Sequence, residues 1–159
     1  LWPELSRVIL CFLMIMGACA GSTGGGFKVS RVVMLLKFAK NEISRAVHPN
    51  AVKIVRMDGK QVSNDVIQNV LVFTVVYIVI VLVSVLLVSL DGYDASATVP
   101  SVLATINNIG PGLGAVGPYG NFASMSVLSK IVLTLDMLIG RLEIFPMVIL
   151  LTPSTWLKN

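Results

Sequence analysis

The distribution of charged residues constrains this chain more than any other feature of its sequence. Charged residues are absent from three long stretches, at residues 8–27, 66–90 and 95–129. Only 13% of the 159 residues are charged, against about 25% in a soluble domain. Uncharged stretches of this length are typical of segments that lie in a lipid bilayer, and they exclude an ordinary globular enzyme. About two to four crossings of roughly 20 residues fit into the chain, which is few for a complete transporter.

Basic residues are concentrated in one region. Eight of the twelve Lys and Arg residues lie between Lys28 and Lys60, and apolar segments flank this region on both sides. A nucleic-acid-binding surface would interleave aromatic residues, but only Phe27 and Phe38 are available here. We therefore interpret the region as cytoplasmic under the positive-inside rule and expect no nucleic-acid partner. The start at Leu1, without a secretory signal pattern, is expected for a fragment of a longer protein.

The apolar pattern predicts an all-α integral membrane protein. Residues 66–90 form the clearest transmembrane helix, which should run outward because basic residues precede it and Asp91 and Asp94 follow it. These two acids could concentrate cations at a pore mouth, although solvated loop residues are the simpler interpretation. Four further helices are predicted at residues 5–18, 27–47, 99–107 and 124–151. Pro3 suits the first turn of the first of these, and Pro100 suits the first turn of the third.

The segment between the predicted helix at residues 27–47 and the long helix at residues 66–90 is predicted to form a short β-hairpin. Residues 51–56 and 60–62 are extended candidates, and Asp58-Gly59 is a favourable two-residue turn between them. The chain then divides into residues 1–50, a cytoplasmic hairpin at 51–62, and residues 63–159. The helix at 27–47 carries basic residues all around its surface, so it can cross a membrane only as an inner helix sheltered by neighbours or water.

Glycine-rich breaks interrupt the chain at two places. Ten of the thirteen glycines fall within residues 17–26 and 110–120, and each group follows a short apolar helix. Irregular backbone at membrane depth is tolerated only where protein or water covers it, so both loops are predicted to be re-entrant. Aligning Gly21 with Gly110 gives two helix–loop–helix repeats that both enter the membrane from the outside.

Three functions can be considered for these breaks. Backbone carbonyls on a glycine-rich loop can replace the water shell of a permeating cation, as in potassium-channel filters. A phosphate cradle is disfavoured, because Phe27 stands where a P-loop has its lysine and no Ser or Thr follows Lys28. Alternatively, the glycines serve close helix packing in a membrane subunit that conducts nothing. The occurrence of two such loops in the same context favours the filter.

Three motifs, taken in order, resemble one family. Residues 19–26 (CAGSTGGG) with Lys28, residues 108–112 (NIGPG) and residues 140–145 (GRLEIF) are similar to segments of the Trk/Ktr/HKT potassium transporters. The resemblance is closest to the TrkH subunits of bacterial Trk systems and covers essentially the whole chain. It implies that the chain holds the third and fourth of four pore repeats. Residues 5–18 and 99–107 would then be pore helices, residues 66–90 an outer helix, and residues 27–47 and 124–151 inner helices.

The resemblance also implies site residues and partners. The filter carbonyls would come from Cys19, Ala20, Gly21, Ser22, Asn108, Ile109, Gly110 and Pro111. The gate and pore electrostatics would come from Gly24, Gly25, Gly26, Lys28 and Arg141. The expected function is potassium uptake across the cytoplasmic (inner) membrane by a multi-pass homodimer, with a cytoplasmic ring of nucleotide-binding regulatory subunits, and with no catalytic residue and no bound cofactor.

The last predicted helix contains three charged side chains. Asp136 and Glu143 are seven residues apart and share a face, whereas Arg141 points away from both. An unpaired Arg in lipid costs at least a few kcal/mol. Arg141 should therefore either pair with another helix or, as the resemblance implies, face the pore below the filter as an electrostatic barrier.

Overall fold

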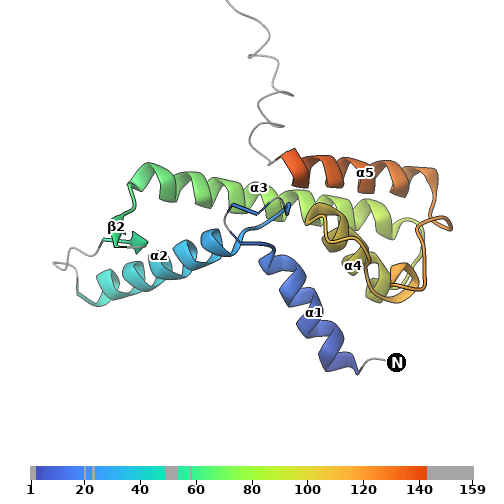
Figure 1. Cartoon of the computed structure of the whole chain (residues 1–159), viewed down its shortest axis with the longest axis horizontal. Helices are drawn as coiled ribbons and strands as arrows, with labels where there is room; N and C mark the ends of the chain where they lie inside the picture. The colour runs from blue at the N-terminus through green and yellow to red at the C-terminus, as the bar shows by residue number, and fades with distance from the viewer. Residues whose placement is uncertain (1–2, 20, 23, 49–53, 58, 143–159) are drawn as a thin grey trace, which may run out of the picture.

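A computed structural model of the chain describes residues 3–19, 21–22, 24–48, 54–57 and 59–142. The order of its helices and strands is shown in Figure 1. The elements are α1 (Glu4–Met16), α2 (Val29–Val47), β1 (Arg56–Met57), β2 (Lys60–Gln61), α3 (Asn64–Ser89), α4 (Ala95–Ile106), the 3₁₀ helix η1 (Gly114–Val116) and α5 (Val127–Leu142). The part of the predicted last helix beyond residue 142, including Glu143, lies outside the described residues.

The long helix α3 forms the axis of the molecule. It has 26 residues and an 18-residue window of mean hydropathy 3.2, of which only 22% is buried inside the structure. Among the described residues, it is the one helix long and apolar enough to cross a membrane. Its bounds differ by two residues or fewer from those predicted, because the run of Val, Leu and Ile determines them locally. Figure 1 shows α5 and α4 beside one half of α3, and α2 beside the other half.

The short helix α4 is the most deeply buried element. It contacts α1, α3 and α5, and every residue from Pro100 to Asn107 is buried. Two of its apolar residues, Ile106 and Val102, belong to two different buried clusters. The first cluster contains Phe27, Phe73, Tyr77 and Ile106. The second contains Val88, Val102, Val116, Met125 and Leu133. The position of α4 therefore brings the loop that follows it into contact with the rest of the fold.

The start of α4 corrects the prediction. The helix begins at Ala95 rather than residue 99, and Pro100 lies in its second turn rather than its first. The carbonyl of Asp94 starts the ladder by accepting the N–H groups of Ala97 (2.9 Å) and Thr98 (3.0 Å). Pro100 is the sixth residue of the helix and lacks an N–H, so it removes only the hydrogen bond to the carbonyl of Ser96. One additional helical turn, which was not predicted, therefore forms before Pro100.

The other boundaries differ by a few residues. Helix α1 ends at Met16 because Gly17 has a φ of 64°, and its side-chain position is filled by the Phe27 carbonyl. Helices α2 and α5 begin at residues 29 and 127, two and three residues later than predicted. The hairpin is shorter than predicted: β1 and β2 pair antiparallel, Arg56 with Gln61 and Met57 with Lys60. Residues 51–53 and 58 of the predicted hairpin lie outside the described residues.

Candidate functional site

The glycine-rich loop before α2 lies against the ends of two other elements. The backbone N–H of Gly26 donates to the carbonyl of Gly140 in α5 (3.2 Å). The N–H of Phe27 donates to Oδ1 of Asn107, the residue that follows α4 (3.3 Å). Segments far apart in the sequence, at residues 26, 107 and 140, are thus joined in one place.

Close backbone approach explains the glycines at this junction. A Cβ on Gly25 would lie 2.7 Å from the Gly140 carbonyl oxygen and 2.6 Å from Nδ2 of Asn108. A Cβ on Gly26 would collide with the Asn107 side chain, and one on Gly140 would collide with the Ile106 carbonyl. The glycine-rich loop, the end of α4 and α5 can therefore meet only where these three positions lack side chains.

The end of α4 turns the chain sharply away from the helix axis. Asn108 has a positive φ of 53°, a conformation in which Asn is among the tolerated residues. The N–H of Ile109 donates to the Ala104 carbonyl (2.9 Å) and that of Asn108 to Thr105 (3.1 Å). These two bonds form a Schellman cap, which satisfies carbonyls at the helix end. The Asn108 amide also donates to the Met137 carbonyl of α5 (3.2 Å), which ties the turn to that helix.

The two glycines aligned by the sequence repeat have similar backbone conformations. Gly21 has a φ of 83° and Gly110 a φ of 105°, and among the described residues no atom beyond the adjoining residues lies within 4 Å of an added Cβ at either position. L-residues with side chains rarely adopt this region, so both positions favour glycine for conformational reasons rather than for space. Ser22 closes a turn by donating its N–H to the carbonyl of Cys19 (3.1 Å). Cys19 itself is exposed. Ala20 lies outside the described residues.

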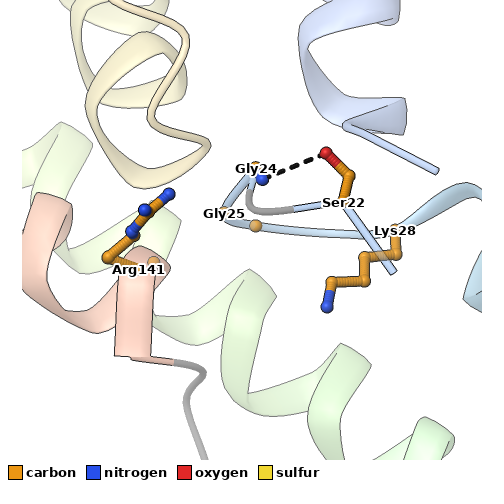
Figure 2. A pocket seen from close by; sticks show the side chains of 7 residues that line it. Ser22, Gly24, Gly25, Lys28 and Arg141 are labelled. Atoms are coloured by element: carbon orange, nitrogen blue, oxygen red, sulfur yellow. Dashed lines mark hydrogen bonds between the residues drawn. The ribbon is translucent and has the colours of Figure 1, made fainter. Parts of the chain in front are cut away.

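A pocket of about 250 Å³ lies beside the junction (Figure 2). It is lined by Ser22, Gly24, Gly25, Gly26, Lys28, Gly140 and Arg141. In Figure 2, Arg141 reaches the pocket from the end of α5, whereas Lys28 comes from the segment that leads into α2. The Ser22 hydroxyl accepts the N–H of Gly24 (3.2 Å) and holds the loop in its turn. All five residues that the resemblance assigned to the gate thus surround one cationic pocket.

The predicted residues of the second loop occupy a different place. Ile109 and Pro111 line a larger cavity of about 670 Å³, together with Arg7, Leu10 and Met14 of α1. Gly21 and Gly110 line neither of these two cavities. The structure therefore brings the predicted gate residues together at one pocket. The predicted filter residues that it describes do not share a cavity: Ser22 lines the smaller one, and Ile109 and Pro111 line the larger one.

Sequence reasoning missed two side-chain contacts that hold this region together. Asn107 and Tyr77 form a buried hydrogen-bonded pair beside the glycine-rich loop. Asp136, which is 2% exposed, accepts a hydrogen bond from the Ser84 hydroxyl (2.8 Å) and so joins α5 to α3. The available signal was a polar side chain within an apolar helix, since buried polar groups require partners. The identity of each partner depends on the packing of the helices.

Comparison with known proteins identifies related chains. Residues 1–158 match the family model described as "TrkH: Cation transport protein". The chain is 41% identical, over 98% of its length, to the Trk system potassium uptake proteins TrkH of Salmonella typhimurium and Escherichia coli K12. It is 35% identical to the Trk system potassium uptake protein TrkG of Escherichia coli K12. It spans 32% of the length of each of these relatives.

The fold is also similar to a solved structure. The crystal structure of the potassium transporter TrkH from Vibrio parahaemolyticus matches 98% of this chain with a TM-score of 0.86 and 40% sequence identity. The match covers 33% of that chain. The helices and loops described above thus resemble about one third of that transporter.

Proposed function

This chain belongs to the TrkH family of cation transport proteins, and we propose that it forms the third and fourth pore repeats of a potassium uptake subunit. The proposal extends the membrane location and transport function of the family to this chain. Potassium would cross the cytoplasmic membrane through a filter of backbone carbonyls and then pass a gate in the interrupted helix of the third repeat. No covalent bond is made or broken in such a process, so the chain is not an enzyme, and potassium is the transported ion rather than a cofactor.

One observation carries the filter proposal. Gly21 and Gly110 follow two short helices at matching places in the chain, and both have positive φ values with open space around them. Packing alone would not require this, because a glycine retained for close packing has a neighbour where its Cβ would lie. Open space on one side of the backbone is what a carbonyl-lined path for an ion needs. We assign the filter carbonyls to residues 19–22 and 108–111.

The cationic pocket supports a separate role for the gate residues. Lys28 and Arg141 place two positive side chains beside Gly24, Gly25 and Gly26. Positive charge next to an ion path raises the energy of a cation there, and this effect is strongest where water is scarce. The glycine loop lies next to that charge, where a displacement of its backbone would change the width of the path. We therefore assign the gate to these five residues, with Arg141 and Lys28 supplying the electrostatic barrier.

The complete transporter would need further components. Because the chain spans about a third of its relatives, we propose that two more repeats complete the pore around the same axis. The name "Trk system" given to the relatives describes a system of several components. A homodimer in the lipid bilayer, with a cytoplasmic ring of nucleotide-binding regulatory subunits, is the assembly that we propose.

The filter assignment is tested by Gly110→Ala in the complete protein. A side chain at a φ of 105° strains the loop and displaces its carbonyls, so we expect the preference for potassium over sodium to fall about tenfold, equivalent to about 1.4 kcal/mol. The measurement is the uptake of rubidium, as a tracer for potassium, and of sodium into proteoliposomes. Gly92→Ala is the matched control, because Gly92 also has a positive φ (75°) and open space but lies in the turn after α3.

The same pair of variants tests the alternative function. If the glycines serve only helix packing in a subunit that conducts nothing, Gly110→Ala and Gly92→Ala should behave alike. An unchanged ion preference in Gly110→Ala, with normal protein levels, would rule out the filter assignment. No uptake by the parent protein would rule out potassium transport itself.

A further inference from the structure

Asn107 lies where the glycine-rich loop, α4 and α3 meet. It is the first residue after α4, and only 3% of its surface is exposed. Its side chain contacts partners from three parts of the chain: Phe27 in the loop, Tyr77 in α3 and Leu103 in α4. The resemblance assigns Asn107 no role in the filter or the gate, because its motif in this loop begins at Asn108.

The hydrogen bonds use both ends of the Asn107 amide. Oδ1 accepts the backbone N–H of Phe27 (3.3 Å), and Nδ2 donates to the carbonyl of Leu103 (2.9 Å). The Tyr77 hydroxyl lies 3.2 Å from Oδ1 and 3.0 Å from Nδ2, so it can donate to one atom or accept from the other. The amide has only one orientation that fits, because a flip would place its NH₂ against the N–H of Phe27. A buried side chain satisfied in this way is held in one position.

The surrounding side chains hold Tyr77 in place. Its ring stacks on Phe73 with centroids 6.3 Å apart and contacts Phe27 at 5.5 Å. These contacts direct its hydroxyl at Asn107. In turn, Asn107 occupies the space that a side chain on Gly26 would fill. Asn107 thus holds the loop at two adjacent residues: it accepts a hydrogen bond from the N–H of Phe27, and it packs directly against Gly26.

We propose that Asn107 is a positioning residue that couples the two re-entrant loops. It immediately precedes the second loop and holds the first loop through Phe27, so a displacement of either loop is transmitted to the other. Tyr77 supports Asn107 from α3 and fixes the pair relative to the long membrane helix. This inference rests on the proposed function, because it assigns Asn107 to the geometry of the filter and the gate.

The proposal distinguishes Asn107 from a residue that only stabilises the fold. A stabilising residue would change the amount of folded protein and leave the ion preference of each folded molecule unchanged. A positioning residue would change both the local mobility of the loop and the ion preference. Both quantities are therefore measured on the same purified, folded protein.

The experiment compares Asn107→Ala and Tyr77→Phe with the parent in the complete protein. Amide hydrogen exchange of peptides covering residues 24–28 should become about 2 to 10 times faster in Asn107→Ala, the range given by the loss of one hydrogen bond. Tyr77→Phe removes a single hydroxyl and should give a smaller change in the same direction. The preference for potassium over sodium should fall in the same order. Tyr93→Phe is the matched control, because Tyr93 lies after α3 and packs on the other buried cluster.

The outcomes separate this inference from the proposed function. If the parent transports potassium but Asn107→Ala and Tyr77→Phe keep its exchange rates and ion preference, Asn107 is not a positioning residue. If exchange accelerates as expected while the ion preference stays constant, the coupling to the filter is wrong. If the parent transports nothing, the proposed function fails, and the exchange data still decide whether Asn107 holds the loop. Tyr77→Phe keeps the test valid should Asn107→Ala fail to fold.

Discussion

At the scale of single residues, Asp91 shows how an acid near a predicted pore mouth serves the fold. Its Oδ2 accepts the backbone N–H of Ser126 (2.9 Å), and the Ser126 hydroxyl accepts the N–H of Ser129 (3.2 Å). Ser126 is therefore the N-cap of α5. In a capping box, the third residue of the helix supplies the carboxylate that reaches back to the N-cap. Here Asp91 supplies it from the end of another helix.

This arrangement predicts an acid-dependent contribution of Asp91 to stability. Hydrogen bonds from the hydroxyl and then the N–H of Ser126 lower the pKa of Asp91 below its usual 3.8. Because the folded-state pKa is the lower one, the contribution is complete above the usual value and is lost as the pH falls through the folded-state pKa. In the complete protein, the thermal unfolding temperature of Asp91→Asn should depend less on pH between about 5 and 3 than that of the parent.

Asp94→Asn is the matched control for this prediction. Asp94 precedes α4 but its side chain makes no capping hydrogen bond. The control should keep the acid dependence of the parent. Equal acid dependence in Asp91→Asn and the parent would show that the carboxylate does not stabilise the start of α5.

At the scale of secondary-structure elements, polar contacts decide how the helices are paired. Two basic side chains of α2 have partners on other elements: the Arg31 guanidinium lies 3.9 Å from the centre of the Phe73 ring, and Lys37 donates to the Arg56 carbonyl (2.9 Å). Helices α3 and α5 are joined by Ser84 and Asp136. One turn after Asp136, Gly140 allows α5 to approach the end of α4. The Ser84–Asp136 contact thus helps to set the position of α5 beside the glycine-rich loop.

We expect Ser84→Ala to weaken the pairing of α3 and α5. The substitution removes the hydroxyl that donates to the Asp136 carboxylate, and hydrogen bonds between membrane helices are worth about 0.6 to 2 kcal/mol. The free energy of unfolding of the complete protein, measured by titration with a denaturing detergent, should fall by that amount. Ser89→Ala is the control, because its exposed hydroxyl donates only to Leu86 within the same helix. A similar loss in both variants would contradict a specific role for the contact.

At the scale of the whole molecule, the two turns that flank α3 lie at its opposite ends (Figure 1). Gly59 lies in the hairpin before α3, and Gly92 lies in the turn after it. Eight basic residues lie between residues 28 and 60, whereas two acidic residues follow the helix. The positive-inside rule therefore predicts that Gly59 lies in the cytoplasm and Gly92 outside.

Cysteine labelling tests this orientation. Gly59→Cys in the complete protein should react with a membrane-impermeant thiol reagent only in inside-out vesicles, and Gly92→Cys only in intact cells. Both sites are open within the part of the chain that the structure describes, since an added Cβ there meets nothing within 4 Å at either glycine. The parent protein measures the background from Cys11 and Cys19. Labelling of both variants from the same side would show that α3 does not cross the membrane.

The sequence by itself determined the features that depend on local residues. The uncharged run at 66–90 fixes α3 as a helix because apolar side chains lie on all of its faces, and Gly59, with a positive φ of 77°, lies in the predicted turn before β2. The positions of the two glycine-rich loops could also be predicted from the clustering of glycines in the sequence. Their motifs were sufficient to indicate the family that the comparisons then showed. The start of α4 was predicted wrongly, because Pro100 suggested a first turn and the Asp94 carbonyl began the helix earlier.

The tertiary structure alone decided which residues hold the loops together. Asn107 bonds to Phe27 and Tyr77, and Gly26 bonds to Gly140, across separations that no local pattern encodes. A buried polar side chain must find a partner, but its sequence does not say which helix will supply it. Only the packing of α4 among α1, α3 and α5 brings these groups within hydrogen-bonding distance. For this reason the positions of the glycine-rich loops could be predicted from the sequence, whereas the contacts that connect them could not.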